Sequence, residues 1–77
     1  MTLQILRQVD ARGLSCPMPI VKTAQAMKDI PSGSLIEVLA TDPGSVKDFA
    51  AWSRTTGHAL VEQSTDDGVY RFVLRRK

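Results

Sequence analysis

Cys16 is the residue of this sequence best suited to chemistry, and it is the only cysteine among the 77 residues. Pro17 follows it directly, and Pro19 follows after one further residue. A proline suits the first position of a helix, so we predict a helix that begins at Pro17 with Cys16 at or near its N-cap. The free N–H groups and the positive dipole of a helix start favour a thiolate, so we expect a thiol pKa below its ordinary value.

A second interpretation of Cys16 stays open beside the first. Lone cysteines are often small buried hydrophobic residues without a chemical role. A buried cysteine gains nothing from the neighbouring prolines, whereas a sulfur held at a helix start does, so the residues alone leave the two interpretations balanced. Arg12 and Lys22 lie close in sequence. They either raise the electrostatic potential at the sulfur or are solvated surface charges.

The periodicity of apolar residues predicts six elements in the order β-α-β-α-β-β. Residues 3–10 alternate with polar residues on both faces, as in an edge strand, and 34–40 is an almost continuous apolar run that suits a central strand. Between them, helical spacing predicts a helix over 17–28. The buried stripe of this helix is expected to comprise Ile20, Val21, Ala24 and Met27.

The second helix is delimited by Asp42 and Gly57. Asp42 suits the N-cap, Pro43 the first helical position and Gly57 the C-cap, so the helix is expected to reach about residue 56. Asp42 has a functional alternative as an acid near the cysteine, which would oppose a thiolate. Trp52 is expected at the flank, as core packing or as a partner contact. The inner face is expected to comprise Val46, Phe49, Ala50 and Ser53.

The end of the sequence predicts a hairpin around the turn 66–68. Its first strand, 59–65, is polar, whereas its second, 69–74, is apolar and belongs in the centre of the sheet. We therefore predict an α/β two-layer sandwich with a mixed sheet of order 1-2-4-3 and two helices on one face. Val69 and Val73 would lie on the open face, either as scattered surface residues or as a partner patch.

Length and composition favour one cytoplasmic domain over residues 1–77. A net charge of +2 is too weak to indicate nucleic acid, and the basic run 75–77 is expected to be a solvated tail. No apolar run approaches the ~20 residues of a membrane span, and residues 1–10 lack the features of a signal peptide. A single cysteine suits a reducing compartment.

The predicted topology separates Cys16 from His58, the only histidine. Cys16 and Asp42 follow the first two parallel strands at one edge of the sheet, whereas His58 precedes the third strand, a strand length of ~20 Å away. Neither a Cys–His pair nor a metal site is expected, and 43–45 lacks the pattern of a phosphate-binding loop. A reactive thiolate without a base, metal or cofactor suits covalent carriage of a group between proteins.

The segment from Gly13 and Leu14 through Cys16, Pro17, Met18 and Pro19 resembles the motif of the TusA, or SirA-like, family of sulfur carrier proteins. The upstream 10–12 and the later Asp42-Pro43 extend the similarity, which covers about residues 7–76. The resemblance implies a sandwich like the C-terminal domain of bacterial translation initiation factor three. It also implies that Cys16 carries a persulfide, supported by Gly13, Leu14, Pro17 and Pro19, with no cofactor and no metal.

The resemblance further implies protein partners for a cytoplasmic sulfurtransferase. Relatives receive sulfur from a cysteine desulfurase or a rhodanese and pass it to an acceptor such as a DsrE-like protein. They serve tRNA thiolation, molybdenum cofactor supply or sulfur oxidation. Arg12, Met18 and Lys22 are the candidate partner contacts. Met18 stands where tRNA-thiolation members have Glu, and Ser53 stands about where some members have a second cysteine.

Two hypotheses follow from the sequence. The first is a monomeric carrier that acts through an exposed, reactive Cys16 and contacts neither a membrane nor nucleic acid directly. The second is a non-catalytic module that binds a protein or RNA through the open sheet face and the basic C-terminal tail. The exposure of Cys16 separates them, because a carrier needs an accessible sulfur and a module would bury it.

Overall fold

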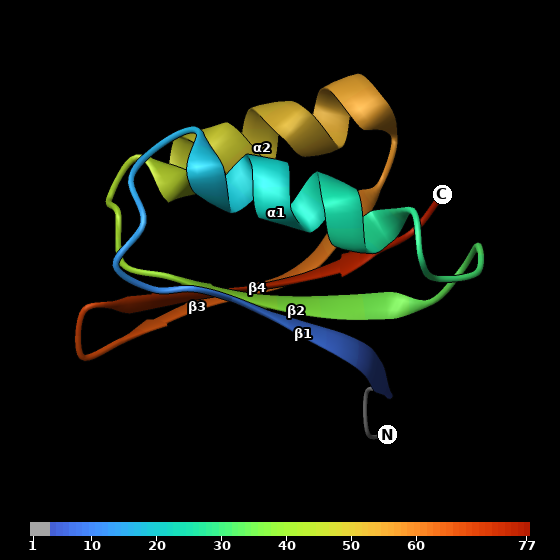
Figure 1. Cartoon of the computed structure of the whole chain (residues 1–77), viewed down its shortest axis with the longest axis horizontal. Coiled ribbons are helices and arrows are strands. Elements are labelled where there is room, and N and C mark those ends of the chain that lie inside the picture. Colours follow the sequence, from blue (N-terminus) through green and yellow to red (C-terminus); the bar gives the residue numbers. More distant parts are fainter. Residues whose placement is uncertain (1–3) are drawn as a thin grey trace.

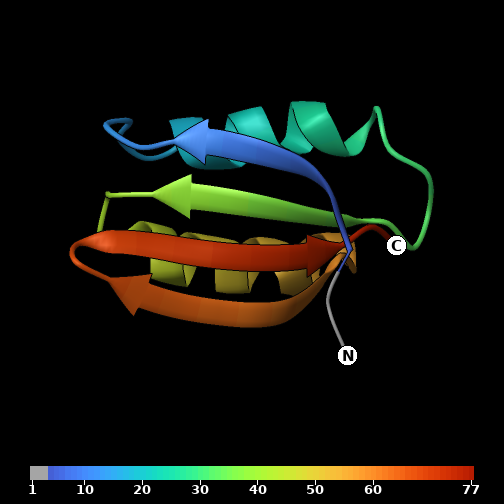
Figure 2. The ribbon, with the colours of Figure 1, turned by 90° about the horizontal axis from the view of Figure 1, so that it is seen from below.

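The computed structural model describes residues 4–77, so Leu3 of the predicted first strand lies outside the described residues. The elements are β1 (Ile5–Ala11), α1 (Met18–Met27), β2 (Leu35–Ala40), α2 (Ser45–Thr56), β3 (Ala59–Asp66) and β4 (Val69–Arg75). Both helices lie on one face of the sheet (Figure 1), and the other face carries no helix (Figure 2). The predicted order of elements and the two-layer architecture are confirmed.

The sheet has the order β1-β2-β4-β3. β1 pairs with β2 in parallel, and β4 pairs antiparallel with both β2 and β3. The hairpin strand β4 therefore fills the centre beside β2, as its apolar sequence predicts, and the polar β1 and β3 form the edges. Because β1 and β2 are parallel, the loops that follow them leave the sheet at the same edge.

The core lies between the helices and the covered face of the sheet. Phe49 of α2 and Phe72 of β4 are both fully buried, with ring centroids 4.6 Å apart. The remaining buried apolar side chains of this cluster are Val9, Ala11, Met27, Ile30, Ile36, Val38, Ala40 and Leu74. Burial of two aromatic rings in so small a protein is a large share of its apolar stabilisation.

The buried face of α1 differs from the predicted stripe. Met27 is buried as predicted, but the other buried residues of the helix are Pro19 and Thr23, and Val21 is 37% exposed. Thr23 was overlooked because its hydroxyl is polar. In the structure this hydroxyl donates a hydrogen bond to the carbonyl of Pro19 at 2.8 Å, which removes the cost of burying it.

Helix α2 begins later than predicted. Gly44 is its N-cap, so Asp42 and Pro43 lie in the turn before the helix, and the predicted N-cap at Asp42 is wrong. The Asp42 carboxylate still accepts a hydrogen bond from the Gly44 N–H at 3.2 Å, and the turn closes by a bond from the Ser45 N–H to the Asp42 carbonyl. The predicted C-cap is confirmed, since Gly57 has a φ of 85° and donates to the Ser53 carbonyl.

Val69 and Val73 were expected on the open sheet face as scattered surface residues or as a partner patch, and neither alternative holds for Val73. Val73 is fully buried and Val69 is half-buried. In the sheet register Val73 lies opposite Glu37 on one side and Glu62 on the other. Arg71 forms ion pairs with both carboxylates, so a charged cluster occupies the centre of this face.

The predicted solvated tail 75–77 is confirmed only in part, because Arg75 and Lys77 are exposed whereas Arg76 is half-buried. The N–H of Arg76 donates to the Ser34 carbonyl at 2.9 Å, and its own carbonyl accepts from Gly33 at 2.8 Å. Its guanidinium donates to the carbonyl of Ile30. The backbone of Arg76 thus continues the pairing of β4, because backbone pairing satisfies groups that water would otherwise solvate.

Candidate functional site

Two loops meet at the edge of the sheet where β1 and β2 end, and Cys16 lies in the first of them. The Cys16 N–H donates to the Asp42 carboxylate at 2.8 Å. The Gly13 N–H donates to the Thr41 hydroxyl at 2.9 Å, and Gly13 has a φ of 80°, which favours glycine. These two bonds fix the cysteine loop to the loop before α2, so the predicted proximity of Cys16 and Asp42 is confirmed.

The Cys16 thiol is exposed and opens onto a hollow between α1 and α2. The hollow has a volume of about 310 Å³ and is mainly apolar. Its lining comprises Cys16, Pro17, Ile20, Asp48, Ala51, Trp52 and Thr55. An accessible sulfur beside an apolar hollow is what a carrier requires, and it contradicts the interpretation of Cys16 as a buried hydrophobic residue.

The electrostatic surroundings of Cys16 are the reverse of those predicted. A hydrogen bond to the Asp48 carboxylate raises the pKa of the Cys16 thiol above its ordinary value. Partial desolvation and the negative charges of Asp48 and Asp42 raise the pKa further. The expected lowering of this pKa is therefore wrong, and the sulfur of the free protein is held as a thiol.

The start of α1 explains why the expected donors do not act on the sulfur. The helix begins at Met18, with Pro17 as its N-cap and Pro19 inside its first turn, so Cys16 lies one residue before the N-cap. Neither proline has an N–H to offer. The Met18 N–H donates to the Ser15 carbonyl at 2.9 Å, and the Cys16 N–H is already bound by Asp42.

The two cations near Cys16 in sequence are bound elsewhere. Arg12 forms a bidentate pair with Asp10 at 2.9 and 3.0 Å, which lowers the pKa of the Asp10 carboxyl to about 2. The Lys22 ammonium donates to the backbone carbonyl of Asp10 at 3.0 Å. Arg12 and Lys22 therefore surround the end of β1, and neither contributes to the pKa of Cys16.

The other motif residues shape the loop and its rim. Leu14 packs partly against the core, and its N–H donates to the Ala11 carbonyl at 3.2 Å. Pro19 is buried under the first turn of α1, whereas Met18 is 44% exposed. The motif therefore supplies an anchor at Leu14, rigid backbone at the prolines and an exposed apolar side chain at Met18.

His58 lies at the opposite edge of the sheet, as predicted. It precedes β3, whose first residue Ala59 pairs with Arg75 at the end of β4. Its Nδ1 atom accepts a hydrogen bond from the Lys77 N–H at 3.0 Å, and its ring lies 5.2 Å from that of Trp52. Burial and the neighbouring positive charges of Arg76 and Lys77 lower the pKa of His58, so the imidazole is neutral at pH 7.

Trp52 packs against the core, which is the first of the two alternatives that the sequence left open at the flank of α2. Its ring packs edge-to-face on Phe49 with centroids 6.2 Å apart, and it is partly buried against the core. The same side chain lines the hollow beside Cys16. Trp52 is thus a wall of the site that the core holds in place.

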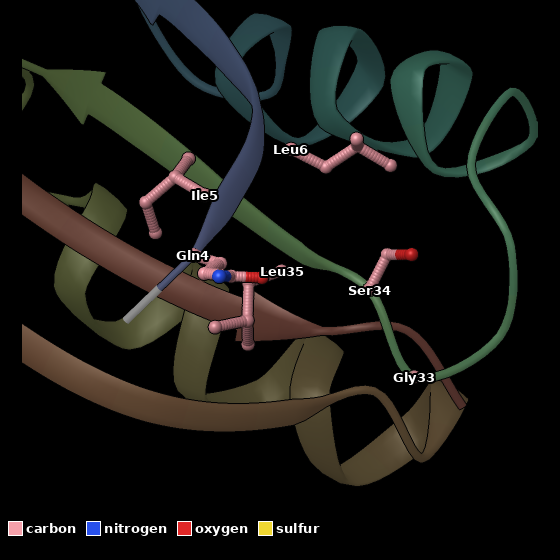
Figure 3. A pocket seen from close by; sticks show the side chains of 6 residues that line it. All are labelled: Gln4, Ile5, Leu6, Gly33, Ser34 and Leu35. Carbon is pink, nitrogen blue, oxygen red and sulfur yellow. The ribbon is translucent and has the colours of Figure 1, made fainter. Parts of the chain in front are cut away.

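A second hollow lies at the other end of the sheet from Cys16. It has a volume of about 490 Å³, and its lining residues come from the start of β1 and the turn before β2 (Figure 3). They are Gln4, Ile5, Leu6, Gly33, Ser34 and Leu35. None of these side chains is charged, so this hollow offers no acid, base or thiol for chemistry.

Two kinds of feature are absent from residues 4–77, the part of the chain that the structure describes. In this part of the chain no three His, Cys, Asp or Glu side chains are grouped to hold a metal ion. Neither α1 nor α2 has the length and apolar character to cross a membrane.

Sequence reasoning missed Asp48 and Thr41. Asp48 lies three residues after Ser45, the start of α2, and only the orientation of the helix shows that it faces the cysteine. Thr41 looked like an ordinary residue of a turn. The signal available was the shared sheet edge, which placed everything between Thr41 and the first turn of α2 near Cys16.

Comparison with known proteins agrees with this geometry. The model of the family described as Sulfurtransferase TusA matches residues 7–76. The sulfur carrier protein TusA of Allochromatium vinosum is 40% identical over 70 residues, covering 91% of this chain and 92% of that protein. The sulfur carrier protein TusA of Pseudomonas syringae pv. syringae is 35% identical over 75 residues, covering 97% and 89%.

A solved structure shares the fold. It is the crystal structure of a SirA-like protein from Desulfitobacterium hafniense, with a TM-score of 0.80, 22% identity and coverage of 91% of this chain and 96% of that one. The family model spans nearly the whole chain, and relatives above 30% identity match over most of their own length. The chain therefore belongs to the TusA family of sulfur carrier proteins.

Proposed function

We propose that this protein carries sulfane sulfur as a persulfide on Cys16 and relays it between two proteins. The observation that supports the proposal best is the exposed Cys16 thiol at the mouth of the hollow between α1 and α2. It is the only thiol in the sequence, so a persulfide on Cys16 has no second cysteine in the chain to resolve it. Membership of the family supports the same chemistry.

The transfer is a displacement at sulfur. The Cys16 sulfur attacks the outer sulfur of a donor persulfide, a new S–S bond forms at Cys16, and the S–S bond of the donor breaks. The donor cysteine leaves as a thiolate and takes up the proton that Cys16 loses, so the step has no net oxidation or reduction. Delivery to an acceptor cysteine is the same reaction in the opposite sense.

The partners follow from this chemistry. A cysteine desulfurase or a rhodanese is the proposed donor, and a DsrE-like protein with its own cysteine is the proposed acceptor, in tRNA thiolation, molybdenum cofactor supply or sulfur oxidation. Met18, which is 44% exposed and follows Cys16 by two residues, is the proposed apolar contact for a partner. We further propose that the chain acts as a monomer of one domain. We also propose that it acts in the cytoplasm, and the lone free thiol supports such a reducing compartment.

Intact-mass analysis tests the proposal. The protein is incubated with a cysteine desulfurase and cysteine, and we expect a gain of one sulfur atom that a reductant removes. Cys16→Ser should abolish this gain and leave the urea midpoint nearly unchanged, because the side chain is exposed.

Loading of the Cys16→Ser variant would contradict the role of Cys16. Failure of the native protein to load from either a desulfurase or a rhodanese would contradict the proposed function itself. Circular dichroism of both proteins is the control, since an unfolded sample would fail to load for a trivial reason.

A further inference from the structure

We propose that Asp48 makes Cys16 a weak holder of sulfur: its carboxylate keeps the empty sulfur protonated and disfavours the anionic persulfide, so that the loaded carrier releases its sulfur readily. This inference rests on the proposed function. It gives Asp48 the role of a positioning residue that sets the charge state of the reacting atom.

The placement of Asp48 carries the inference. It lies in the first turn of α2 and lines the same hollow as Cys16, and its carboxylate raises the pKa of the Cys16 thiol. The positive end of the α2 dipole favours a negative charge at this position. A carboxylate held there accepts a bond from a neutral S–H but repels a sulfur anion.

The charges around the sulfur come from each of the surrounding elements. Asp42, in the loop before α2, adds a second negative charge. The cations of the β1–α1 loop and of α1, Arg12 and Lys22, are both bound to Asp10. No positive charge in the described residues therefore offsets Asp48 at the sulfur.

The consequence for the carried sulfur follows from the difference between a thiol and a persulfide. A persulfide ionises more readily than a thiol, so at neutral pH loading replaces a neutral S–H by an anionic outer sulfur, and the proton of Cys16 passes to the thiolate that leaves the donor. Asp48 bonds to the first form and repels the second. It therefore shifts the sulfur-transfer equilibrium away from Cys16 and toward whichever partner offers a more favourable site.

Alkylation of the empty protein tests Asp48 without any sulfur transfer. The rate of Cys16 labelling by iodoacetamide is measured against pH for the native protein and for Asp48→Asn. We expect the midpoint of Asp48→Asn to lie at lower pH, because the carboxylate that holds the proton is gone. Asp48→Glu keeps the charge and should restore part of the native behaviour.

Asp29→Asn is the matched control. It removes the same charge from an exposed carboxylate beyond the far end of α1, where Asp29 pairs loosely with Arg7 at 3.6 Å. Its midpoint should equal that of the native protein. A midpoint of Asp48→Asn at or above the native value, in a protein that melts as a folded domain, would overturn the proposal.

The second measurement is the partition of sulfur. Each protein is equilibrated with a fixed ratio of glutathione persulfide to glutathione, and the loaded fraction is read by intact mass. We expect a several-fold higher ratio of loaded to empty Asp48→Asn than of native protein or Asp29→Asn, and an unchanged or lower ratio would overturn the proposal.

The two measurements separate the inference from the function on which it rests. If neither the native protein nor the variants take up sulfur, the proposed carrier function fails, while the alkylation midpoints still decide whether Asp48 controls the proton. If the native protein loads but the midpoints coincide, the carrier function stands and the role of Asp48 is wrong.

Discussion

Two pairs of carboxylates in this protein have opposite surroundings. On the open face of the sheet, Glu37 and Glu62 both contact Arg71, at 2.5 and 2.6 Å. The hydrogen bonds from Gln8 and Arg71 lower the pKa of Glu37 below its ordinary value. Here the charges of the two acids and of the arginine neutralise one another, and this ion-paired cluster covers Val73.

At the sulfur edge, Asp42 and Asp48 have no such compensation. Neither forms an ion pair with a cation of residues 4–77, and together they raise the pKa of the thiol they face. A carboxylate therefore stabilises the fold when it is paired, as in Glu37, and tunes a reactive group when it is left unpaired, as in Asp48.

The largest loss of stability is expected when the core beneath both regions is disrupted. Phe49 is fully buried between Trp52 and Phe72, so Phe49→Ala should lower the free energy of unfolding by ~3–5 kcal/mol. That is a large part of the stability of a domain of this size. Urea unfolding measures this change in the free energy of unfolding. A loss below ~1 kcal/mol would show that neither region depends on the core around Phe49.

A smaller effect is expected when the paired region alone is broken. Arg71→Met leaves the 16%-exposed side chain of Glu37 without its cation, so the free energy of unfolding at pH 7 should fall by ~1–2 kcal/mol, while the alkylation midpoint of Cys16 stays the same.

The pH dependence of this loss gives its sign. The folded-state pKa of Glu37 is lowered from 4.5, so its pairing stabilises the native state above that pH and the contribution disappears as the pH falls through the folded value. The gap in urea midpoint between Arg71→Met and the native protein should therefore narrow in acid. An equal gap at neutral and acid pH would mean that the loss comes from packing of the arginine stem and not from charge.

The smallest effect concerns the start of α2. Ser45 is 1% exposed, and its hydroxyl has no hydrogen-bond partner within the described chain. Ser45→Ala removes an unsatisfied buried group, so we expect a gain of ~0.5–1 kcal/mol in thermal or urea melts and no change at Cys16. A clear loss of stability would contradict this expectation, because it would show that the hydroxyl has a hydrogen-bond partner in solution.

The fold was predictable from the sequence because its pattern is binary. The contrast between the apolar 69–74 and the polar 59–65 places β4 inside the sheet, and Gly57 ends α2 where its left-handed backbone requires. Errors arose where a polar side chain finds a local partner. Thr23 is buried through its bond to Pro19, and Asp42 caps a turn instead of the helix itself.

The chemistry at Cys16 was only half predictable. The motif and the shared sheet edge gave the nucleophile and brought Asp42 beside it. The direction of the shift in the thiol pKa was not predicted. It depends on the rotation of α2, which turns Asp48 toward the sulfur, and on which N–H groups remain free. Neither quantity follows from spacing along the chain, since both are set by how the two helices pack.

The two hydrogen bonds that tie the cysteine loop to the loop before α2 affect how partner proteins can reach Cys16. A sulfur at the end of a long flexible segment can reach one bound protein while another remains bound. Here Asp42 holds the Cys16 backbone and Thr41 holds the rest of the loop, so the sulfur has one fixed position on the molecule. On the proposed function, we therefore expect donor and acceptor proteins to bind at Cys16 one after the other, because both must reach the same fixed sulfur.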